Sequence, residues 1–413
     1  MYQGFDMSGN LTISSDAPMP FPPGEFEWRW AAVDARLMEA NLEAAIVWSR
    51  GAGGFDRFQD VFYLTHYYSC NSGCAYDWMQ SGTRAAGNCA ALVRRGRAPV
   101  LIADDPTFDP EGVATPDTIG ETDVIAGVVK AIRRDGLTGR VGFVGTDCIS
   151  ARHMAALREL LPEIVFEAQD ELVAHVRVVK SANELDMCRR GGETVTLAMN
   201  AMFERLFDGA TEAQAAGEAA RIVAERQGRL NFCHLAHGPW MGKRMTDVPM
   251  VGYSNRRPPT GSLVRGWLYG AVHRGYWLDP GRTVVMGTPT AEQRHLLESG
   301  ARIVEELRAM IRPGVSAAEV TLRGSQLRED FQGRSEADDE WFAVYGHGNG
   351  LYWDPPILTR NYRGPHQTFA EGMVASTEVF LELPGIGACG FEQNFIVTRD
   401  GTELLTRSPL LWW

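Results

Sequence analysis

The stretch Gly275-Tyr-Trp-Leu-Asp-Pro-Gly-Arg-Thr283 carries Asp279, the first of four polar residues that follow one another in glycine-rich and β-branched surroundings. The other three are His347 in Gly346-His-Gly-Asn-Gly-Leu351, Glu378 in Gly372-Met-Val-Ala-Ser-Thr-Glu378, and Glu392 in Gly390-Phe-Glu-Gln-Asn394. Segments of this composition favour packed β-strands. Carboxylates and an imidazole suit a divalent first-row metal, Mn, Fe, Co or Zn, because hard oxygens and a borderline nitrogen neutralise and orient it. The order Asp, His, Glu, Glu therefore predicts a metal site between strands.

In these segments the chain resembles the superfamily of methionine aminopeptidases, Xaa-Pro peptidases and creatinases, whose catalytic domain is called the pita-bread fold. The likeness begins near Arg177-Val-Val-Lys-Ser-Ala-Asn-Glu184, includes Pro313-Gly314 after a helix, and runs to the C-terminus. The resemblance implies an α+β protein with a catalytic domain over residues 176–413 and a smaller creatinase-like α/β domain over residues 1–175. It also implies a homodimer, because the N-terminal domain of the family commonly lends residues to its neighbour's site.

One ligand position of the family is missing from this chain. The family has a further aspartate eleven residues before the one matched by Asp279, with a glycine two residues after it; here Gly270 fits the glycine, but Leu268 stands in the aspartate's place. In the family that aspartate serves one metal of a pair, and the positions matched by the four residues above surround the other. The resemblance therefore implies a single metal ion, or none if the chain departs further from the family pattern.

Two more departures point away from peptide hydrolysis. The family's peptidases follow the His-Gly loop with a His-Glu-x-Pro run that handles the substrate amide, whereas this chain has Trp353-Asp-Pro-Pro356. A second substrate-facing histidine is expected shortly before the missing aspartate, and the segment Pro249-Met-Val-Gly-Tyr-Ser-Asn-Arg-Arg257 has none. We therefore expect a member of the family that does not act on peptides.

The composition limits the possible partners. With 413 residues, of which 45% are hydrophobic and 22% charged, the chain is long enough for two domains with full cores. Its formal net charge of -12 argues against nucleic acid, whose phosphates need a clustered excess of Lys and Arg. No apolar run approaches the ~20 residues of a membrane span, and seven scattered cysteines favour a reducing compartment. We expect a cytoplasmic protein that binds a small molecule rather than nucleic acid or a membrane.

Hydrophobic periodicity predicts the elements around the four segments. In the N-terminal part we expect helices over 25–43 and 151–160 and strands at 44–48, 88–93, 98–103, 141–144 and 164–167. In the C-terminal part, amphipathic patterns over 182–202, 211–227 and 293–311 predict helices on the outside of a curved sheet.

Aromatic residues near the ligand candidates predict the nature of the substrate. Walls of Trp and Tyr hold onium cations, since the negative ring face attracts a charge that cannot donate hydrogen bonds. Arg282 follows Asp279 closely enough to hold a carboxylate in a two-pronged geometry. For any single ring the alternative is core packing, and for Arg282 it is a structural ion pair. Together these features predict a small zwitterionic substrate, bound by Trp48, Trp240, Tyr253, Tyr276, Tyr352, Trp353 and Arg282.

Among family members that do not act on peptides, the dimethylsulfoniopropionate lyases of this fold resemble this combination of a single metal and a zwitterionic substrate best. Their β-elimination gives dimethyl sulfide and acrylate, and it needs a base for the proton alpha to a carboxylate that the metal holds. The candidate bases are His273, Asp279 and Tyr345, which stands two residues before His347 and is therefore expected on the same face of a strand. We therefore expect a lyase that uses a single metal.

Two hydrolase alternatives stay open. Creatinase and ectoine hydrolase use this fold without the full dinuclear set, and a site of that kind would use His347, Glu378 and Glu392 to activate water or substrate, with His234 or His237 as partner. The second alternative is an Xaa-Pro-type metallopeptidase. A catalytically silent binding protein is disfavoured, because an idle site has no need to keep carboxylates buried at a desolvation cost of several kcal/mol each.

Overall fold

The computed structural model describes residues 20–22, 24–51, 57–70, 85, 87–238, 241, 250–333, 344–360, 362–364 and 367–413. They form two compact units, one extending to Gln169 and the other comprising Asp170–Trp413. The boundary predicted at residue 175 falls inside α6 (Glu171–Arg177), which belongs to the second unit. Within the described residues, no helix is long and apolar enough to cross a membrane.

A mixed six-stranded sheet with the order β4-β3-β2-β1-β5-β6 organises the first unit. Its central strand β1 is antiparallel to β2 and parallel to β5. Its core is mostly aliphatic and includes Ile102 of the sheet with Val128 and Ile132 of α4. The elements are α1 (Glu25–Glu39), β1 (Ala44–Arg50), α2 (Gln59–Thr65), β2 (Asn88–Arg94), β3 (Arg97–Ala103), η1 (Pro110–Gly112), β4 (Asp117–Gly120), α4 (Val124–Arg134), β5 (Gly139–Val144), α5 (Ala151–Leu160) and β6 (Ile164–Ala168).

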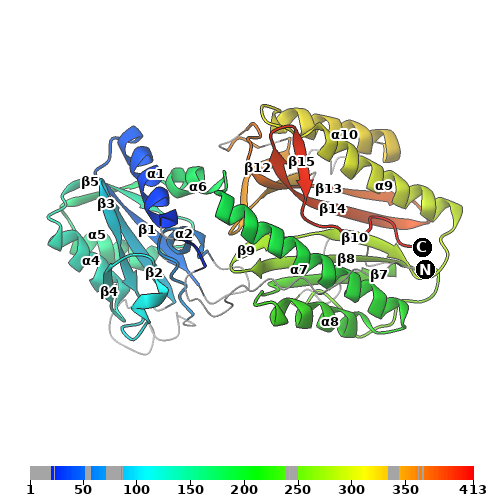
Figure 1. Ribbon diagram of the computed structural model, residues 1–413, viewed down its shortest axis with the longest axis horizontal. Helices are drawn as coiled ribbons and strands as arrows, with labels where there is room; N and C mark the ends of the chain where they lie inside the picture. The colour runs from blue at the N-terminus through cyan, green and yellow to red at the C-terminus, as the bar shows by residue number, and fades with distance from the viewer. Residues whose placement is uncertain are drawn as a thin grey trace. The chain divides into compact units, whose positions relative to one another are not determined.

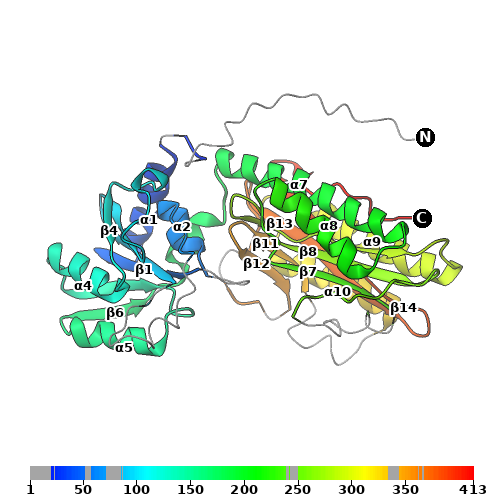
Figure 2. The ribbon, with the colours of Figure 1, turned by 90° about the horizontal axis from the view of Figure 1, so that it is seen from below.

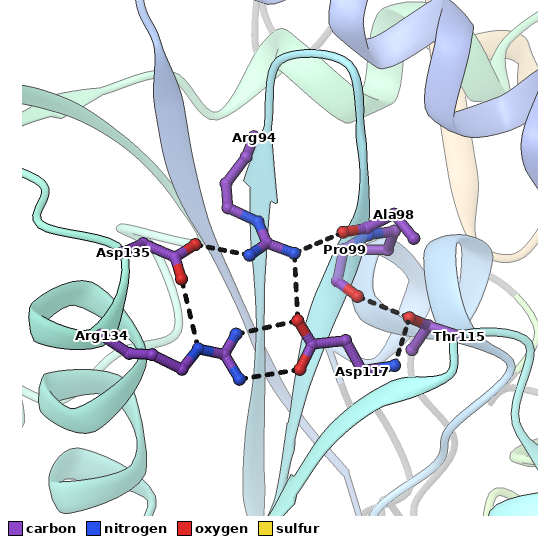
Figure 3. Close-up of polar contacts among 7 residues, drawn as sticks. All are labelled: Arg94, Ala98, Pro99, Thr115, Asp117, Arg134 and Asp135. Atoms are coloured by element: carbon purple, nitrogen blue, oxygen red, sulfur yellow. Dashed lines mark hydrogen bonds and ion pairs between the residues drawn. The ribbon is translucent and has the colours of Figure 1, made fainter.

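An ion-pair network ties the edge of this sheet to the end of α4 (Figure 3). Arg134, in the last turn of α4, donates to both oxygens of Asp117 on β4, at 2.9 and 2.8 Å. Arg94 at the end of β2 donates to Asp117, to Asp135 just after α4, and to the carbonyl oxygen of Ala98 on β3. The network therefore joins three strands and one helix of the first unit.

An antiparallel sheet of nine strands organises the second unit (Figure 1). Its order is β12-β11-β13-β14-β10-β8-β7, with β15 paired to β14 and β9 paired to β8. β13 and β14 stay in register along their length, which places Glu378 directly opposite Glu392. The strands are β7 (Phe232–His237), β8 (Leu263–His273), β9 (Tyr276–Leu278), β10 (Gly281–Val285), β11 (Val344–Asn349), β12 (Trp353–Thr359), β13 (Val374–Leu383), β14 (Gly387–Thr398) and β15 (Gly401–Leu404).

Four long helices of the second unit begin at capping boxes. They are α7 (Ala182–Phe207), α8 (Glu212–Glu225), α9 (Ala291–Met310) and α10 (Ala317–Gln332). In each, a Ser or Thr hydroxyl accepts the N–H of the residue three positions later, and the Glu or Gln there accepts the N–H of the capping residue. These local signals fix where the helices start.

The helices cover one face of the sheet. Figure 2, which views the molecule from below, shows α7 running along the strands. Gly266 of β8 lies against side chains of α7, and Phe391 of β14 lies against Gly300 of α9. Because side chains alternate along a strand, the following residues, Trp267 and Glu392, point to the opposite face. That second face carries the candidate site.

Candidate metal centre

Three buried residues converge on the face of the sheet opposite the helices. Asp279 follows β9 directly, His347 lies on β11 and Glu392 lies on β14. His347 Nε2 lies 3.2 Å from Asp279 Oδ2 and 3.5 Å from Glu392 Oε1. One potential ligand atom from each residue lies within 4.8 Å of the other two, and none of the three side chains is appreciably exposed. Segments separated by more than 40 residues thus supply one compact donor group.

Asp279 is held by three side-chain donors. Asn349 and Asn394 donate their amide N–H groups to Oδ1 at 3.1 and 3.0 Å, and the Trp353 indole donates to Oδ2 at 2.9 Å. Burial acts to raise the pKa of Asp279, but the nearby His347 and the hydrogen bond from Trp353 help to outweigh it and hold the pKa below its usual value. Asp279 is therefore a pre-oriented anion.

His347 presents one ring nitrogen to the carboxylates. Its Nδ1 lies 3.1 Å from the carbonyl oxygen of Gly348, which is the contact of an Nδ1–H donor and leaves Nε2 facing Asp279 and Glu392. Burial acts to lower the pKa of His347, but the charge of Asp279 overcomes it and raises the pKa to about 9. A backbone partner on the far nitrogen is the arrangement that orients metal-binding histidines.

Glu392 has two oxygens in different surroundings. Oε2 accepts the indole N–H of Trp267 at 2.6 Å, whereas Oε1 accepts no hydrogen bond from any residue that the structure describes. Burial, together with the charges of Asp279 and Glu378, raises the pKa of Glu392 well above its usual value. A buried carboxylate oxygen without a donor, beside an imidazole nitrogen and a second carboxylate, fits a divalent cation, which would favour the charged form of Glu392.

Glu378 lies beside this group but outside it. It stands opposite Glu392 in the β13–β14 register, so both side chains occupy the same face of the sheet. Its charge contributes to the raised pKa values of His347 and Glu392. The donor group comprises Asp279, His347 and Glu392, so three of the four predicted ligands come together and Glu378 stands next to them.

Leu268 points away from the donor group. It pairs with Cys233 of β7, whose Sγ lies 3.9 Å from Met202 of α7, so this pair faces the helices. Tyr269, the next residue on β8, points to the other face. There burial and the charges of Glu392, Glu378 and Asp279 raise the pKa of its hydroxyl. On this strand, the face of the donor group carries an aromatic hydroxyl and no carboxylate.

The segment in place of His-Glu-x-Pro divides between the site and the core. The Trp353 ring lies 4.5 Å from the His347 ring and is 45% exposed, so it covers the donor group on its outer side. Asp354 is buried and pairs with Arg177 at 3.0 Å and Lys180 at 2.8 Å. The ion pairs of Asp354 thus fix the backbone next to Trp353, while the Trp353 ring remains accessible.

Tyr345 does not share the face of His347, contrary to the prediction. Its ring packs against Gly324 of α10 and belongs to the core under the helices. The alternation of β11 is broken between the two residues, because the β11–β12 register shifts there and Gly346 adopts a φ of 135°. Tyr345 is therefore a core residue, and its predicted place beside His347 is wrong.

The surroundings of His273 and Arg282 indicate structural roles and not contact with a substrate. His273 lies at the β8–β9 hairpin, where burial and the neighbouring Arg190 and Arg274 lower its pKa to about 4. Arg282 is fully buried and uses its guanidinium on Gln393 Oε1 and on backbone carbonyl oxygens, among them those of Pro409 and Ser408. These five bonds occupy all its N–H groups, so the predicted carboxylate clamp is wrong.

The predicted aromatic wall is dispersed. Trp48 is buried in the core of the first unit and donates to Asn88 Oδ1, and Tyr276 is buried and donates to Glu184 Oε1 at 2.9 Å. Tyr253 is half-buried on the segment that binds Glu212, and Trp240 lies outside the described residues. Tyr352, half-buried next to Trp353, is the other predicted ring near the donor group.

Sequence reasoning missed the donors that hold the ligands. Asn349 lies two residues after His347 and Asn394 two residues after Glu392, and the amides of both reach Asp279 on the face of the donor group. For Asn394, which lies in the regular β13–β14 pairing, this two-residue spacing was a signal in the sequence. Trp267 was not predicted as a site residue, because nothing local in the sequence indicates that its N–H reaches a residue 125 positions away.

The comparison with protein families agrees with this geometry. The profile described as "Metallopeptidase family M24" matches residues 186–399, which include the whole donor group. The chain belongs to metallopeptidase family M24. The "Probable dipeptidase PepE" of Mycobacterium tuberculosis is 30% identical over 276 residues, 64% of this chain and 68% of that protein. The "Xaa-Pro dipeptidase" of Lactobacillus delbrueckii subsp. lactis is 26% identical over 270 residues, 63% and 68% of the two chains.

Solved structures show that this M24 protein has the fold predicted for it. The Xaa-Pro dipeptidase from Bacillus anthracis matches with a TM-score of 0.73 at 19% identity, over 94% of this chain and all of that one. Dipeptidase PepE from Mycobacterium ulcerans gives a TM-score of 0.71 at 22% identity, over 95% and 98%. The predicted α+β class, with an N-terminal α/β domain and a C-terminal pita-bread domain, is confirmed.

The same findings overturn the predicted reaction. The family is a metallopeptidase family and the relatives carry dipeptidase names, which contradicts a lyase acting on dimethylsulfoniopropionate. The prediction gave decisive weight to the lost aspartate and the lost His-Glu-x-Pro run. Both losses leave Asp279, His347 and Glu392 in place as a buried donor group, and the predicted aromatic rings within the described residues do not form one wall beside them.

Proposed function

We propose that this M24 protein is a metal-dependent hydrolase that cleaves the peptide bond of a dipeptide. The observation that carries the proposal is the buried donor group of Asp279, His347 and Glu392 within the matched region. Its relatives named as dipeptidases support the substrate class. Dipeptides with proline in second position are the first substrates to test, because one of those relatives is named for them.

The metal would be held by the three residues of the donor group, and we propose a single ion. A divalent metal, when bound, polarises a scissile carbonyl and acidifies water. The one-ion proposal is supported by β8, where Leu268 faces α7 and supplies no ligand. Manganese, iron, cobalt and zinc all suit two carboxylates and an imidazole.

Glu378 is proposed as the group that accepts the proton of the attacking water. It lies on the face of the donor group, opposite Glu392, yet it is not one of the three clustered ligands. A carboxylate that is near the reacting atoms but does not hold the metal can move a proton from water to the leaving amine. Trp353 and Tyr352, at the accessible side of His347, are proposed to contact the substrate.

The test is dipeptide hydrolysis by protein stripped with a chelator and reloaded with Mn²⁺ or Co²⁺. We expect hydrolysis only by the reloaded protein, and loss of both metal and activity in Asp279→Asn. Glu378→Gln should keep the metal and lose about 10²–10⁴-fold in kcat, the usual contribution of a general base. The matched control is Glu382→Gln on the same strand, where the side chain is exposed. Reloaded, folded protein that cleaves no dipeptide with or without proline would defeat the proposal.

A cytoplasmic location and a homodimer stay predictions. Light scattering on purified protein measures the second directly, and a mass near twice the 45.6 kDa of one chain is expected.

A further inference from the structure

The Trp267 ring lies flat across the floor of the sheet beside the donor group. A side chain at Gly281 of β10 would fall within 1.9 Å of the indole, and one at Gly390 of β14 within 2.5 Å. The indole therefore extends from β8 across two neighbouring strands that have no side chain at those positions. It is 2% exposed and stacks on Phe380 of β13, with ring centroids 5.0 Å apart and planes at 16°. The ring has no room to turn away.

The polar end of this ring meets a metal-ligand candidate. Trp267 Nε1 donates to Glu392 Oε2 at 2.6 Å, while Glu392 Oε1 faces His347. An indole nitrogen is a donor only and cannot bind a cation. Glu392 Oε2 thus faces a fixed N–H donor. A carboxylate that bound two metal ions would need the second ion in that position.

We propose that Trp267 closes the space beside Glu392 to a second cation and thereby sets the centre to one metal ion per chain. The inference rests on the proposed function, since it presupposes that Asp279, His347 and Glu392 hold a metal. It adds the reason for the stoichiometry. Glu392 offers the metal one oxygen because an indole clamped by Phe380, Gly281 and Gly390 occupies the other.

The decisive variant is Trp267→His. The five-membered rings of Trp and His share their geometry from Cβ outward, so an imidazole Nε2 can take the position of the indole Nε1. The exchange replaces a fixed donor by a metal ligand and removes the six-membered ring, which frees space. The matched control is Trp277→His, which removes an equally buried indole from β9 of the same sheet, where Trp277 packs against Tyr352.

The measurement is metal stoichiometry, by calorimetric titration of chelator-stripped protein with Co²⁺ and by elemental analysis after desalting. We expect about one ion per chain in the wild type and in Trp277→His, and about two in Trp267→His. Two ions in the wild type, or a single ion in Trp267→His that retains the wild-type circular dichroism spectrum, overturns the inference. No ion in the wild type defeats the proposed metal-dependent function itself, so the two failures are distinguishable.

Trp267→Phe keeps the test decisive if Trp267→His does not fold. Phenylalanine retains a ring over Gly281 and Gly390 but removes the N–H, so Glu392 can offer both oxygens to the same ion. We expect one Co²⁺ per chain with a changed visible absorption spectrum, because the spectrum reports the ligand set. A spectrum identical to that of the wild type contradicts the role given to the indole N–H.

Discussion

At the scale of single residues, Asp279 depends on the donors behind it. Trp353→Phe keeps a ring against His347 but removes the N–H that reaches Asp279 Oδ2 at 2.9 Å. We expect the affinity for Mn²⁺ to fall about tenfold, the low end of the range for losing a hydrogen bond to a metal ligand. The low end applies because Trp353 is 45% exposed and water can partly replace its N–H. Calorimetric titration of stripped protein measures the change.

The control for this exchange is Trp28→Phe, since Trp28 is 47% exposed on α1 of the first unit. Its affinity for Mn²⁺ should equal that of the wild type. An unchanged affinity in Trp353→Phe as well would mean that Asn349 and Asn394 alone orient Asp279.

The sequence predicted which residues could hold a metal, but it did not predict which side chains and carbonyl groups contact the residues next to them. Asp279, His347 and Glu392 stand in recognisable glycine-rich segments, and the structure brings them together. Arg282 stands in the same segment as Asp279, but its partners near residues 392 and 408 lie more than 100 positions away. A long side chain with remote acceptors cannot be assigned from local spacing.

At the scale of elements, two helix glycines with different surroundings give opposite predictions. At Gly324 of α10 a Cβ would lie 2.5 Å from the ring of Tyr345 on β11. Gly324→Ala should therefore destabilise the protein by about 1–3 kcal/mol, because overpacking outweighs the gain of roughly 1 kcal/mol in helix propensity. Gly217 of α8 is exposed and has nothing within 4 Å, so Gly217→Ala should stabilise by about 0.5–1 kcal/mol. Urea unfolding of the two variants measures both signs, and a stabilised Gly324→Ala would contradict the contact.

Elements were predictable where a local signal fixes them. The predicted helix over 211–227 corresponds to α8, which starts at the capping box of Thr211 and Gln214. The face of Tyr345 was not predictable, because it depends on a register shift between β11 and β12 that arises from pairing and not from either strand alone. A period-two pattern assigns faces only while the pairing is regular.

At the scale of the whole molecule, a buried ion cluster ties the start of the second unit to the edge strand of its sheet. Arg177 and Lys180, at the end of α6 and just before α7, bind the two oxygens of Asp354 on β12, more than 170 positions along the chain. Burial acts to raise the pKa of Asp354, but the two cations hold it below its usual value. Asp354 therefore contributes stability that is present above the pKa of an unfolded aspartate and is lost as the pH falls through the lower, folded value.

Asp354→Asn should remove that contribution and leave two buried cations without their counter-charge. At pH 7 we expect a loss of about 3–5 kcal/mol in the free energy of unfolding, the usual cost of breaking a buried pair. The difference from the wild type should narrow below about pH 4, where Asp354 of the unfolded wild-type chain begins to take up a proton while the folded protein still holds the carboxylate charged. Urea unfolding at pH 7, 5 and 3.5 follows this change. The control is Asp400→Asn in the exposed turn between β14 and β15, which should leave the free energy of unfolding unchanged at all three pH values. A difference that stays constant across this range would assign Asp354 a packing role and no electrostatic one.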